Sequence, residues 1–217
     1  MTVHIVWDWN GTLLDDLDLV VRAVSRSISR FGVEPISPDD YRDHYTRPVR
    51  DFYNSLFGRV VDDMEWEVLN KTFHDEYYSG VDDAALTVDA VPSLEHAASL
   101  GWSQSLLSMS THSRLRPTVA AHGSDHHLKL ISGLENPTGH PKATHRDSHL
   151  KRQGIAPSGV VVIGDTPDDH HAADAVGATS ILYDGGSHHR PVLEAAGAPV
   201  VDTLTDALRL VEERVTA

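Results

Sequence analysis

Short apolar runs alternate with amphipathic stretches along most of this chain. The helical patterns lie at about residues 93–100, 112–122, 143–153, 168–176 and 203–215. Strand–helix alternation of this kind predicts an α/β fold with a doubly wound parallel sheet. The apolar runs that we interpret as its strands are Val3–Trp7, Ser105–Met109, Leu128–Ile131, Val160–Ile163 and Ser180–Tyr183, with Val200–Val201 as the start of a sixth.

The alternation stops between Asp15 and about Ala85, where only helical patterns are found. Asp16–Phe31 has helical spacing and stops at Gly32, and Val60–Tyr78 is a second long pattern. Ser37-Pro38-Asp39-Asp40 is a helix start, with a capping hydroxyl, an early proline and acids in the first turn. We therefore expect an all-helical domain at residues 15–85, inserted into a core of residues 1–14 and 86–217, with linkers near 14–16 and 81–88.

Composition excludes several classes of protein. The 217 residues carry a formal net charge of −14 and no cysteine, which argues against a nucleic-acid binder, a disulfide scaffold and a cysteine nucleophile. No apolar run approaches the roughly 20 residues of a membrane span, and no signal-peptide pattern is visible. We expect a cytoplasmic protein without a nucleic-acid or membrane partner, either a monomer or a homodimer.

Histidine is unusually frequent. The chain has 15 histidines, and six of them form the pairs His126-His127, His170-His171 and His188-His189. No metal-binding spacing such as HExxH accompanies them. We interpret them mainly as polar surface residues, with a second metal site as the alternative.

Reactive side chains follow the expected strands, where ligands bind in doubly wound sheets. Asp8 follows the first strand, Ser108 ends the second and Asp165 follows the fourth, while Lys142 opens a helix. Asp8 could attack phosphorus, and a hard cation such as Mg²⁺ could lie between Asp8 and Asp165. Lys142 and Ser108 would hold phosphate oxygens, and Gly11 allows close backbone approach. This set of residues suits phosphoryl transfer.

The segments DWNGTLLDD (8–16) and GDTPDDHHAADAVGA (164–178), with Ser108 and Lys142 between them, resemble the four ordered motifs of the haloacid dehalogenase superfamily. Within it the chain is similar to phosphoglycolate-phosphatase-like hydrolases, which have a Rossmann-like core and a helical cap inserted after the first motif. The resemblance implies that Asp8 is the nucleophile and that Mg²⁺ is held by the Asp8 carboxylate, the carbonyl of Asn10 and Asp165, supported by Asp169. The implied substrate is a small phosphorylated metabolite. The candidate residues are Asp8, Asn10 and Lys142 for catalysis, Asp8, Asn10, Asp165 and Asp169 for the metal, and Gly11, Thr12, Ser108, Met109 and Lys142 for the substrate.

Two positions depart from the pattern of this family. Asn10 stands where the phosphatases usually carry an acid/base aspartate, and an amide cannot exchange a proton at neutral pH. Met109 stands where an asparagine is common, and Ser110 could take part of that role. A slow Mg²⁺-dependent phosphatase is the first hypothesis. A phosphate-binding or regulatory protein with little turnover is the alternative, and a dehalogenase is less favoured because GDTPDD keeps the acids of a metal site.

Several residues near these motifs fit structural roles. Asp15 and Asp16 are expected to cap the first inserted helix, and Asp168 to be a solvated acid at a helix start. Arg47 and Arg50 could bind a substrate anion from the inserted domain, although solvated positions are equally compatible with the sequence. Aromatic residues at helical spacing, such as Trp66 and Tyr77, are expected in the core of that domain.

Overall fold

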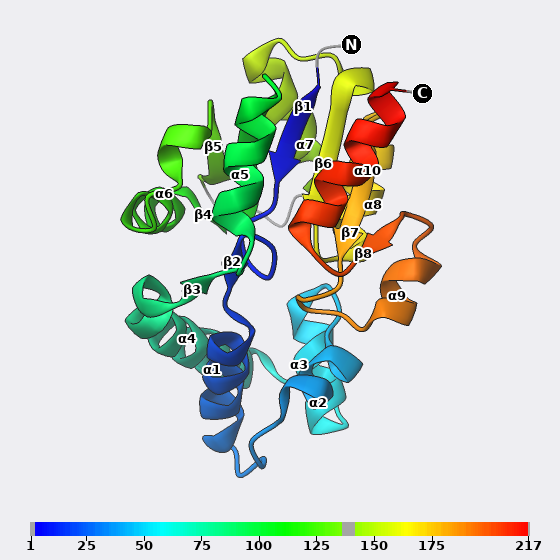
Figure 1. Cartoon of the computed structure of the whole chain (residues 1–217). Helices are drawn as coiled ribbons and strands as arrows, with labels where there is room; N and C mark the ends of the chain where they lie inside the picture. The colour runs from blue at the N-terminus through cyan, green and yellow to red at the C-terminus, as the bar shows by residue number, and fades with distance from the viewer. Residues whose placement is uncertain (1–2, 136–141, 217) are drawn as a thin grey trace.

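Six parallel strands form the central sheet in the order β5-β4-β1-β6-β7-β8 (Figure 1). The computed structural model describes residues 3–135 and 142–216. The mainly apolar β1 lies in the middle of the sheet and pairs with β4 along one edge and with β6 along the other. The strands are β1 (His4–Trp7), β4 (Ser103–Thr111), β5 (Ile131–Leu134), β6 (Val160–Gly164), β7 (Thr179–Tyr183) and β8 (Val200–Val201).

Helices cover both faces of the sheet, with α5 and α10 in front and α7 and α8 behind in Figure 1. Alternate residues of β1 point to opposite faces: Ile5 and Trp7 pack with side chains of α5, α6 and α10, whereas Val6 packs with those of α7 and α8. The core helices are α5 (Ala90–Ser99), α6 (His112–Ala121), α7 (Lys142–Gln153), α8 (Pro167–Asp174), α9 (Arg190–Ala195) and α10 (Leu204–Thr216), and short 3₁₀ turns lie at Val81–Asp83, Asp125–His127 and Pro157–Gly159.

A helical layer, called the cap below, lies between β2 (Leu14–Asp15) and β3 (Ala85–Leu86). These two short strands pair antiparallel, so the chain enters and leaves the cap through one narrow ribbon. The cap has its own apolar cluster, which includes Ile28, Phe52 and Leu69. Its helices are α1 (Leu17–Ser29), α2 (Pro38–His44), α3 (Val49–Phe57) and α4 (Asp63–Gly80), seen below the sheet in Figure 1.

The predicted α/β fold with a doubly wound parallel sheet is confirmed, with local corrections. The strand expected at Leu128–Ile131 begins only at Ile131, because the residues before it leave a 3₁₀ turn and make isolated bonds to β4. The helix expected from Val60 starts at Asp63, where the side chains of Asp62 and Glu65 form a capping box. The helix start at Ser37 is confirmed, whereas α3 and α9 were not predicted as separate helices.

Two histidines lie in the core and are exceptions to the expected surface role, whereas most of the described histidines are exposed or only partly buried. The side chain of His4 bonds Ser103 through Nδ1 and Ser105 through Nε2, each at 2.7 Å. The ring of His149 bonds Ser105 through Nε2 at 2.7 Å and Ser132 through Nδ1 at 2.8 Å. Burial first of all, with the charge of Lys129, lowers the pKa of His4 to about 4. Burial also lowers the pKa of His149 to about 3, so both rings are neutral at pH 7.

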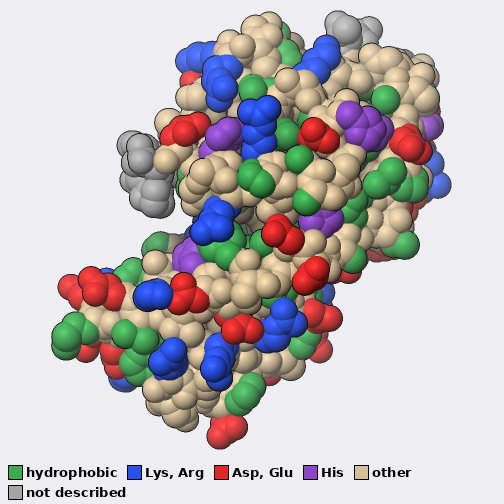
Figure 2. Space-filling model, turned by 90° about the vertical axis from the view of Figure 1, so that its left-hand side faces the viewer, with side chains coloured by type: hydrophobic (Ala, Val, Ile, Leu, Met, Phe, Trp, Pro, Cys, Tyr) green, Lys and Arg blue, Asp and Glu red, His purple; other side chains and the backbone are tan. Residues whose placement is uncertain are grey.

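The described part of the chain contains no helix that is long and apolar enough to cross a membrane. On the face shown in Figure 2, basic side chains are interspersed with acidic ones rather than gathered into one patch.

Candidate active site

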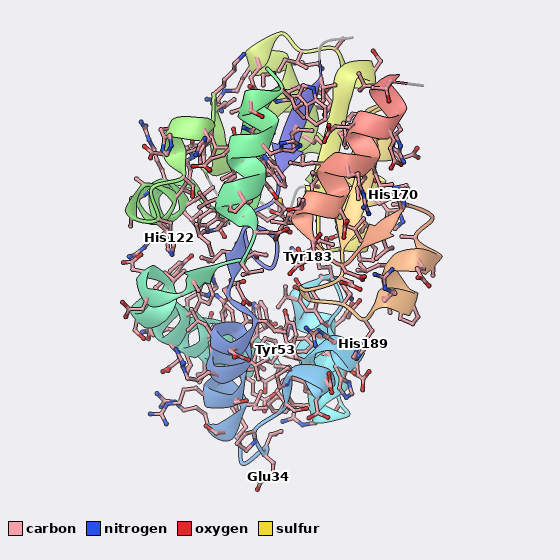
Figure 3. The ribbon with its side chains drawn as sticks, in the orientation of Figure 1. Glu34, Tyr53, His122, His170, Tyr183 and His189 are labelled. Carbon is pink, nitrogen blue, oxygen red and sulfur yellow. The ribbon has the colours of Figure 1, made fainter. Side chains whose placement is uncertain are left out.

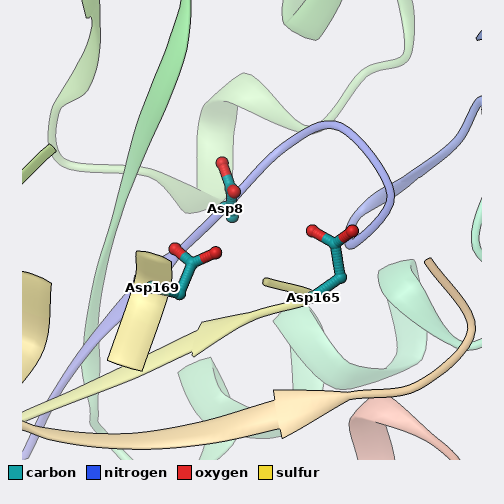
Figure 4. Close-up of side chains that lie close together, drawn as sticks. All are labelled: Asp8, Asp165 and Asp169. Carbon is teal, nitrogen blue, oxygen red and sulfur yellow. The ribbon is translucent and has the colours of Figure 1, made fainter. Parts of the chain in front are cut away.

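Three buried carboxylates meet at the carboxyl edge of the sheet. Asp8 follows β1, Asp165 follows β6, and Asp169 lies in the first turn of α8. One oxygen from each lies within 4.8 Å of the others, and the three side chains converge in Figure 4. The sequence-based expectation placed Asp8 and Asp165 together because parallel strands end at one edge, and the resemblance added Asp169 beside them. Oxygen ligands in this arrangement suit a hard divalent cation.

Lys142 and Arg146 supply the positive charge beside these acids. The ammonium of Lys142 lies 2.6 Å from Asp8 Oδ2 and 2.7 Å from Asp169 Oδ1. Arg146, one turn further along α7, lies 3.2 Å from Asp169 through Nη2. Burial alone would raise the pKa of Asp169, but Lys142 and Arg146 outweigh it and lower the pKa. Asp169 is therefore a stable carboxylate held between two cations.

Asp165 has no such cation among the described residues. Burial, followed by the charges of Asp8 and Asp169, raises its pKa. Its Oδ1 accepts a bond from the Thr12 hydroxyl at 3.1 Å, and its Oδ2 accepts one from the Ser187 amide at 2.8 Å. Burial also raises the pKa of Asp8, against the opposing charge of Lys142. A divalent cation between Asp8 and Asp165 would relieve this excess of negative charge.

Gly11 is required by the close approach of the loop after β1 to Asp165. Its φ is +68°, and a Cβ at this position would lie 2.5 Å from Asp165 Oδ2. A side chain would therefore displace the carboxylate. The Gly11 amide donates to Asp16 Oδ1 at 2.8 Å.

The Asn10 side chain is fixed by partners on both sides of its amide. Its Nδ2 donates to Asp16 Oδ2 at 2.7 Å and to the Tyr77 hydroxyl at 2.6 Å. Its Oδ1 accepts from the hydroxyls of Ser110 at 2.7 Å and Ser108 at 3.3 Å. These partners match an amide side chain: acceptors, one of them a carboxylate, face the NH₂ group, and two hydroxyl donors face the oxygen.

Asp16 corrects one sequence-based expectation. It precedes α1, but its side chain makes no capping bond to the helix. The carboxylate is buried against Asn10 and Gly11, and it also accepts a 2.6 Å bond from the Tyr77 hydroxyl. Burial raises the pKa of Asp16. Tyr77, expected only in the cap core, thus reaches the site, while Asp15 is exposed on β2.

A loop after β7 joins the cap to the site. The guanidinium of Arg42 donates through Nε to the Gly186 carbonyl at 3.0 Å. The next residue, Ser187, holds Asp165 through its amide. The ring of His188 packs against Tyr45, with centroids 5.3 Å apart. His189 contacts α2 through Asp43 at 3.2 Å and lies beside the cap in Figure 3.

The two arginines considered as anion ligands have different surroundings. Arg47 lines the cavity at the site and pairs through Nε with Asp168 at 3.4 Å, so Asp168 makes an ion pair rather than only facing solvent. Arg50 bonds the Val61 carbonyl and Asp63 within the cap, and the cavity lining does not include it.

A cavity of about 370 Å³ extends from this site into the cap. Most of the predicted site residues line it. Thr12, which donates to Asp165, and Asp169, which pairs with Lys142, are not on the lining. Trp66, expected in the cap core, belongs to the apolar packing of the cap and also borders this cavity. The predicted residues on its lining are Asp8, Asn10, Gly11, Ser108, Met109, Lys142 and Asp165.

Sequence reasoning missed Arg146, the site role of Asp16 and the loop at Ser187. An arginine in a polar helix carries no signal of burial, yet the Arg146 side chain is 1% exposed and its Nε and Nη1 have no partner among the described residues. The signal for Asp16 was its place at the end of the first motif segment, DWNGTLLDD (8–16).

Comparison with known proteins agrees with this geometry. The family model of haloacid dehalogenase-like hydrolases matches residues 5–183. A phosphoglycolate phosphatase of Pseudomonas fluorescens is 24% identical over 92% of this chain and 76% of its own length. Another, from Vibrio parahaemolyticus, is 21% identical over 95% of each chain. The solved structure of a haloacid dehalogenase-like hydrolase from Streptococcus pneumoniae superposes with a TM-score of 0.84 at 19% identity, over 97% of this chain and 98% of the other. The chain belongs to the haloacid dehalogenase-like hydrolase family, as its motifs predicted.

Proposed function

We propose that this protein is a Mg²⁺-dependent phosphatase that hydrolyses small phosphate monoesters through Asp8. The observation that carries the proposal is the convergence of Asp8, Asp165 and Lys142 on one cavity, with the carboxylate of Asp169 beside them. The similarity to phosphoglycolate phosphatases supports the same reaction class.

The donor set fits a magnesium ion. Asp8 and Asp165 provide buried carboxylate oxygens, and the carbonyl of Asn10 is the third expected ligand. Asp169 is held by Lys142 and Arg146, which suits a supporting role beside the ion. When bound, Mg²⁺ screens the carboxylates from an anionic substrate and polarises phosphate oxygens.

Asp8 is the nucleophile in this proposal. Its Oδ1 accepts a bond from the Trp9 amide at 2.8 Å, and Lys142 holds its Oδ2, so the carboxylate has a fixed orientation. A carboxylate oxygen forms a bond to phosphorus as the bond from phosphorus to the alcohol oxygen breaks, and the leaving oxygen takes a proton from solvent water. Water then hydrolyses the aspartyl-phosphate, which releases phosphate and restores Asp8.

Lys142 and Ser108 bind the phosphate oxygens. The ammonium of Lys142 already bridges Asp8 and Asp169, so its charge lies beside the reacting atoms. The Ser108 hydroxyl lies on the cavity wall and donates to Asn10 at 3.3 Å. Asn10 orients this wall but transfers no proton, which reduces the rate by about 10²–10⁴-fold relative to an acid/base residue.

The test is phosphate release from an aryl phosphate, with and without Mg²⁺, by the wild type and by Asp8→Asn. Mg²⁺-dependent release that the Asp8→Asn variant loses is the expected result. Asp174→Asn, which changes an exposed acid on α8, is the matched control and should retain activity. Release without metal, or undiminished release by Asp8→Asn, would refute the proposal.

A further inference from the structure

The cap side of the cavity is lined with rings. Aromatic residues make up only 6% of the chain, yet many of those in the cap face this one space. They come from α2, α3, α4 and the segment between α2 and α3, and Figure 3 shows Tyr53 between α1 and α3. This lining includes the partly exposed rings of Tyr45, Trp66 and Phe73, while the buried Tyr41, Phe52 and Tyr53 pack against Tyr45 and Trp66.

These rings form a preorganised wall. Tyr41 and Tyr45 stack with centroids 4.9 Å apart at 20°, and Phe52 meets Tyr45 edge-on at 5.8 Å. Tyr53 is fixed by an edge contact with Trp66 at 5.9 Å. Rings held by one another lose little freedom when a ligand packs on them.

Aliphatic side chains of α1 complete this part of the cavity. Leu17, Val20 and Val24 lie on its lining, and Val24 is buried within the cap. An apolar space with a few polar groups at one end is typical of sites for small organic molecules. The polar end here is the carboxylate site with Lys142.

Charge in the cavity disfavours a second anion on the substrate. The cationic side chains on its described lining are Lys142 and Arg47. Lys142 lies between Asp8 and Asp169, and Arg47 pairs with Asp168. A substrate carboxylate would compete for these cations while facing the acids of the lining, whereas an uncharged apolar group would pack on the rings and the aliphatic side chains without that competition.

We propose that the alcohol part of the substrate is an uncharged, ring-bearing group that packs on the aromatic wall of the cap while its phosphate lies at Asp8. This inference rests on the proposed phosphatase function and adds a substrate class to it. The reaction is hydrolysis of the ester to a ring-bearing alcohol and inorganic phosphate.

The test compares kcat/KM for benzyl phosphate, ethyl phosphate and 2-phosphoglycolate in the presence of Mg²⁺. Benzyl and ethyl phosphate both release a primary alcohol, so their intrinsic reactivity is similar and the ring is the main difference. Benzyl phosphate should exceed each of the other two by at least about tenfold, the usual effect of a matched apolar group.

A cavity-filling variant checks where the ring binds. Val20→Phe should reduce the preference for benzyl over ethyl phosphate to below about threefold, because Val20 is a partly exposed residue of the lining and the new ring occupies the same space. Val68→Phe is the matched control, since Val68 is 42% exposed on α4 and is not part of the lining. It should retain the preference.

A binding measurement separates this inference from the proposed function. Benzylphosphonate, which cannot be hydrolysed, should bind the wild type at least about tenfold more tightly than ethylphosphonate in calorimetry. If no ester is hydrolysed but this difference is found, the phosphatase proposal fails and the ring site stands. If ethyl phosphate or 2-phosphoglycolate is hydrolysed at least as well as benzyl phosphate, or the two phosphonates bind equally, the ring-bearing substrate class is wrong.

Discussion

Asn10 and Asp16 form a matched pair in which one residue donates and the other accepts. The amide of Asn10 faces the Asp16 carboxylate at 2.7 Å, and the Tyr77 hydroxyl bonds both side chains. The departure at residue 10 is therefore part of a local arrangement of three side chains. A carboxylate at residue 10 would face a second carboxylate in a buried place.

Asn10→Asp alone should reduce stability by about 1–3 kcal/mol, because it replaces a donor with a like charge. Exchanging the two residues in Asn10→Asp/Asp16→Asn restores one amide and one carboxylate. We expect the double variant to recover most of the loss in urea unfolding. Additive losses in the double variant would contradict the pairing.

Gly11 offers a second test at the scale of one residue. Gly11→Ala should weaken Mg²⁺ binding by about 10–100-fold in calorimetry, because the new Cβ displaces Asp165. Gly32→Ala is the matched control, since Gly32 also has a positive φ, of +74°, but nothing lies within 4 Å of its added Cβ. Both variants carry the cost of a left-handed backbone, so equal Mg²⁺ affinities would refute the steric explanation.

At the scale of elements, the chain of serines and histidines links β1, β4, β5 and α7. Ser105 has one hydroxyl proton but lies between the Nε2 atoms of His4 and His149. It can donate to only one of them, so the other ring must donate to Ser105. The two neutral histidines therefore hold opposite tautomers.

The two buried histidines of this hydrogen-bonded network should make the stability of the core sensitive to acid. An unfolded histidine has a pKa near 6.5, whereas the folded values are about 4 for His4 and about 3 for His149. The unfolded state therefore binds more protons below pH 6.5, and the stability present above that pH is lost as pH falls toward 4. Between pH 7 and 5 each ring accounts for about 2 kcal/mol of this loss.

The measurement is urea unfolding at pH 7 and pH 5. His149→Gln should lose about 2 kcal/mol less than the wild type between the two values. His171→Gln, which replaces an exposed histidine outside this hydrogen-bonded network, is the matched control and should keep the wild-type difference. An unchanged difference in His149→Gln would exclude a contribution from the buried ring.

The elements themselves were largely predictable, because strand position follows apolar runs. The run at Leu128–Ile131 shows the limit. Lys129 and Leu130 do bond to β4, but the regular ladder begins only at Ile131. No local sequence pattern distinguishes such isolated bonds from a regular ladder. Asp8 and Asp165 were predictable from the strand ends, and Asp169 from the resemblance of its segment to the fourth motif of the family. Arg146 and Tyr77 were not, since their burial depends on which helices pack together.

At the scale of the whole molecule, the cap is joined to the core by a short ribbon. The paired residues are Leu14 with Leu86 and Asp15 with Ala85, and the Thr87 amide adds a bond to the Leu13 carbonyl. This ribbon has far fewer backbone hydrogen bonds than the six-stranded sheet of the core. The two segments were expected to be linkers from sequence, but their pairing needed the fold.

We expect the cap to hinge at this ribbon. Amides at 14–15 and 85–86 should then exchange hydrogen faster than those of β1 and β6, which lie in the middle of the sheet. Hydrogen exchange measured by mass spectrometry or NMR provides the check. Protection of the ribbon equal to that of the central strands would contradict a hinge there.

The loop at Gly186 and Ser187 couples the position of the cap to the carboxylate site. The Gly186 carbonyl accepts a hydrogen bond from Arg42 of the cap, and the Ser187 amide donates one to Asp165. If docking of the cap through this loop raises the affinity of Asp165 for an ion, the ion must raise the population of the docked cap by the same factor. The effect of cap docking on ion affinity and the effect of the ion on cap docking would then give the same coupling free energy.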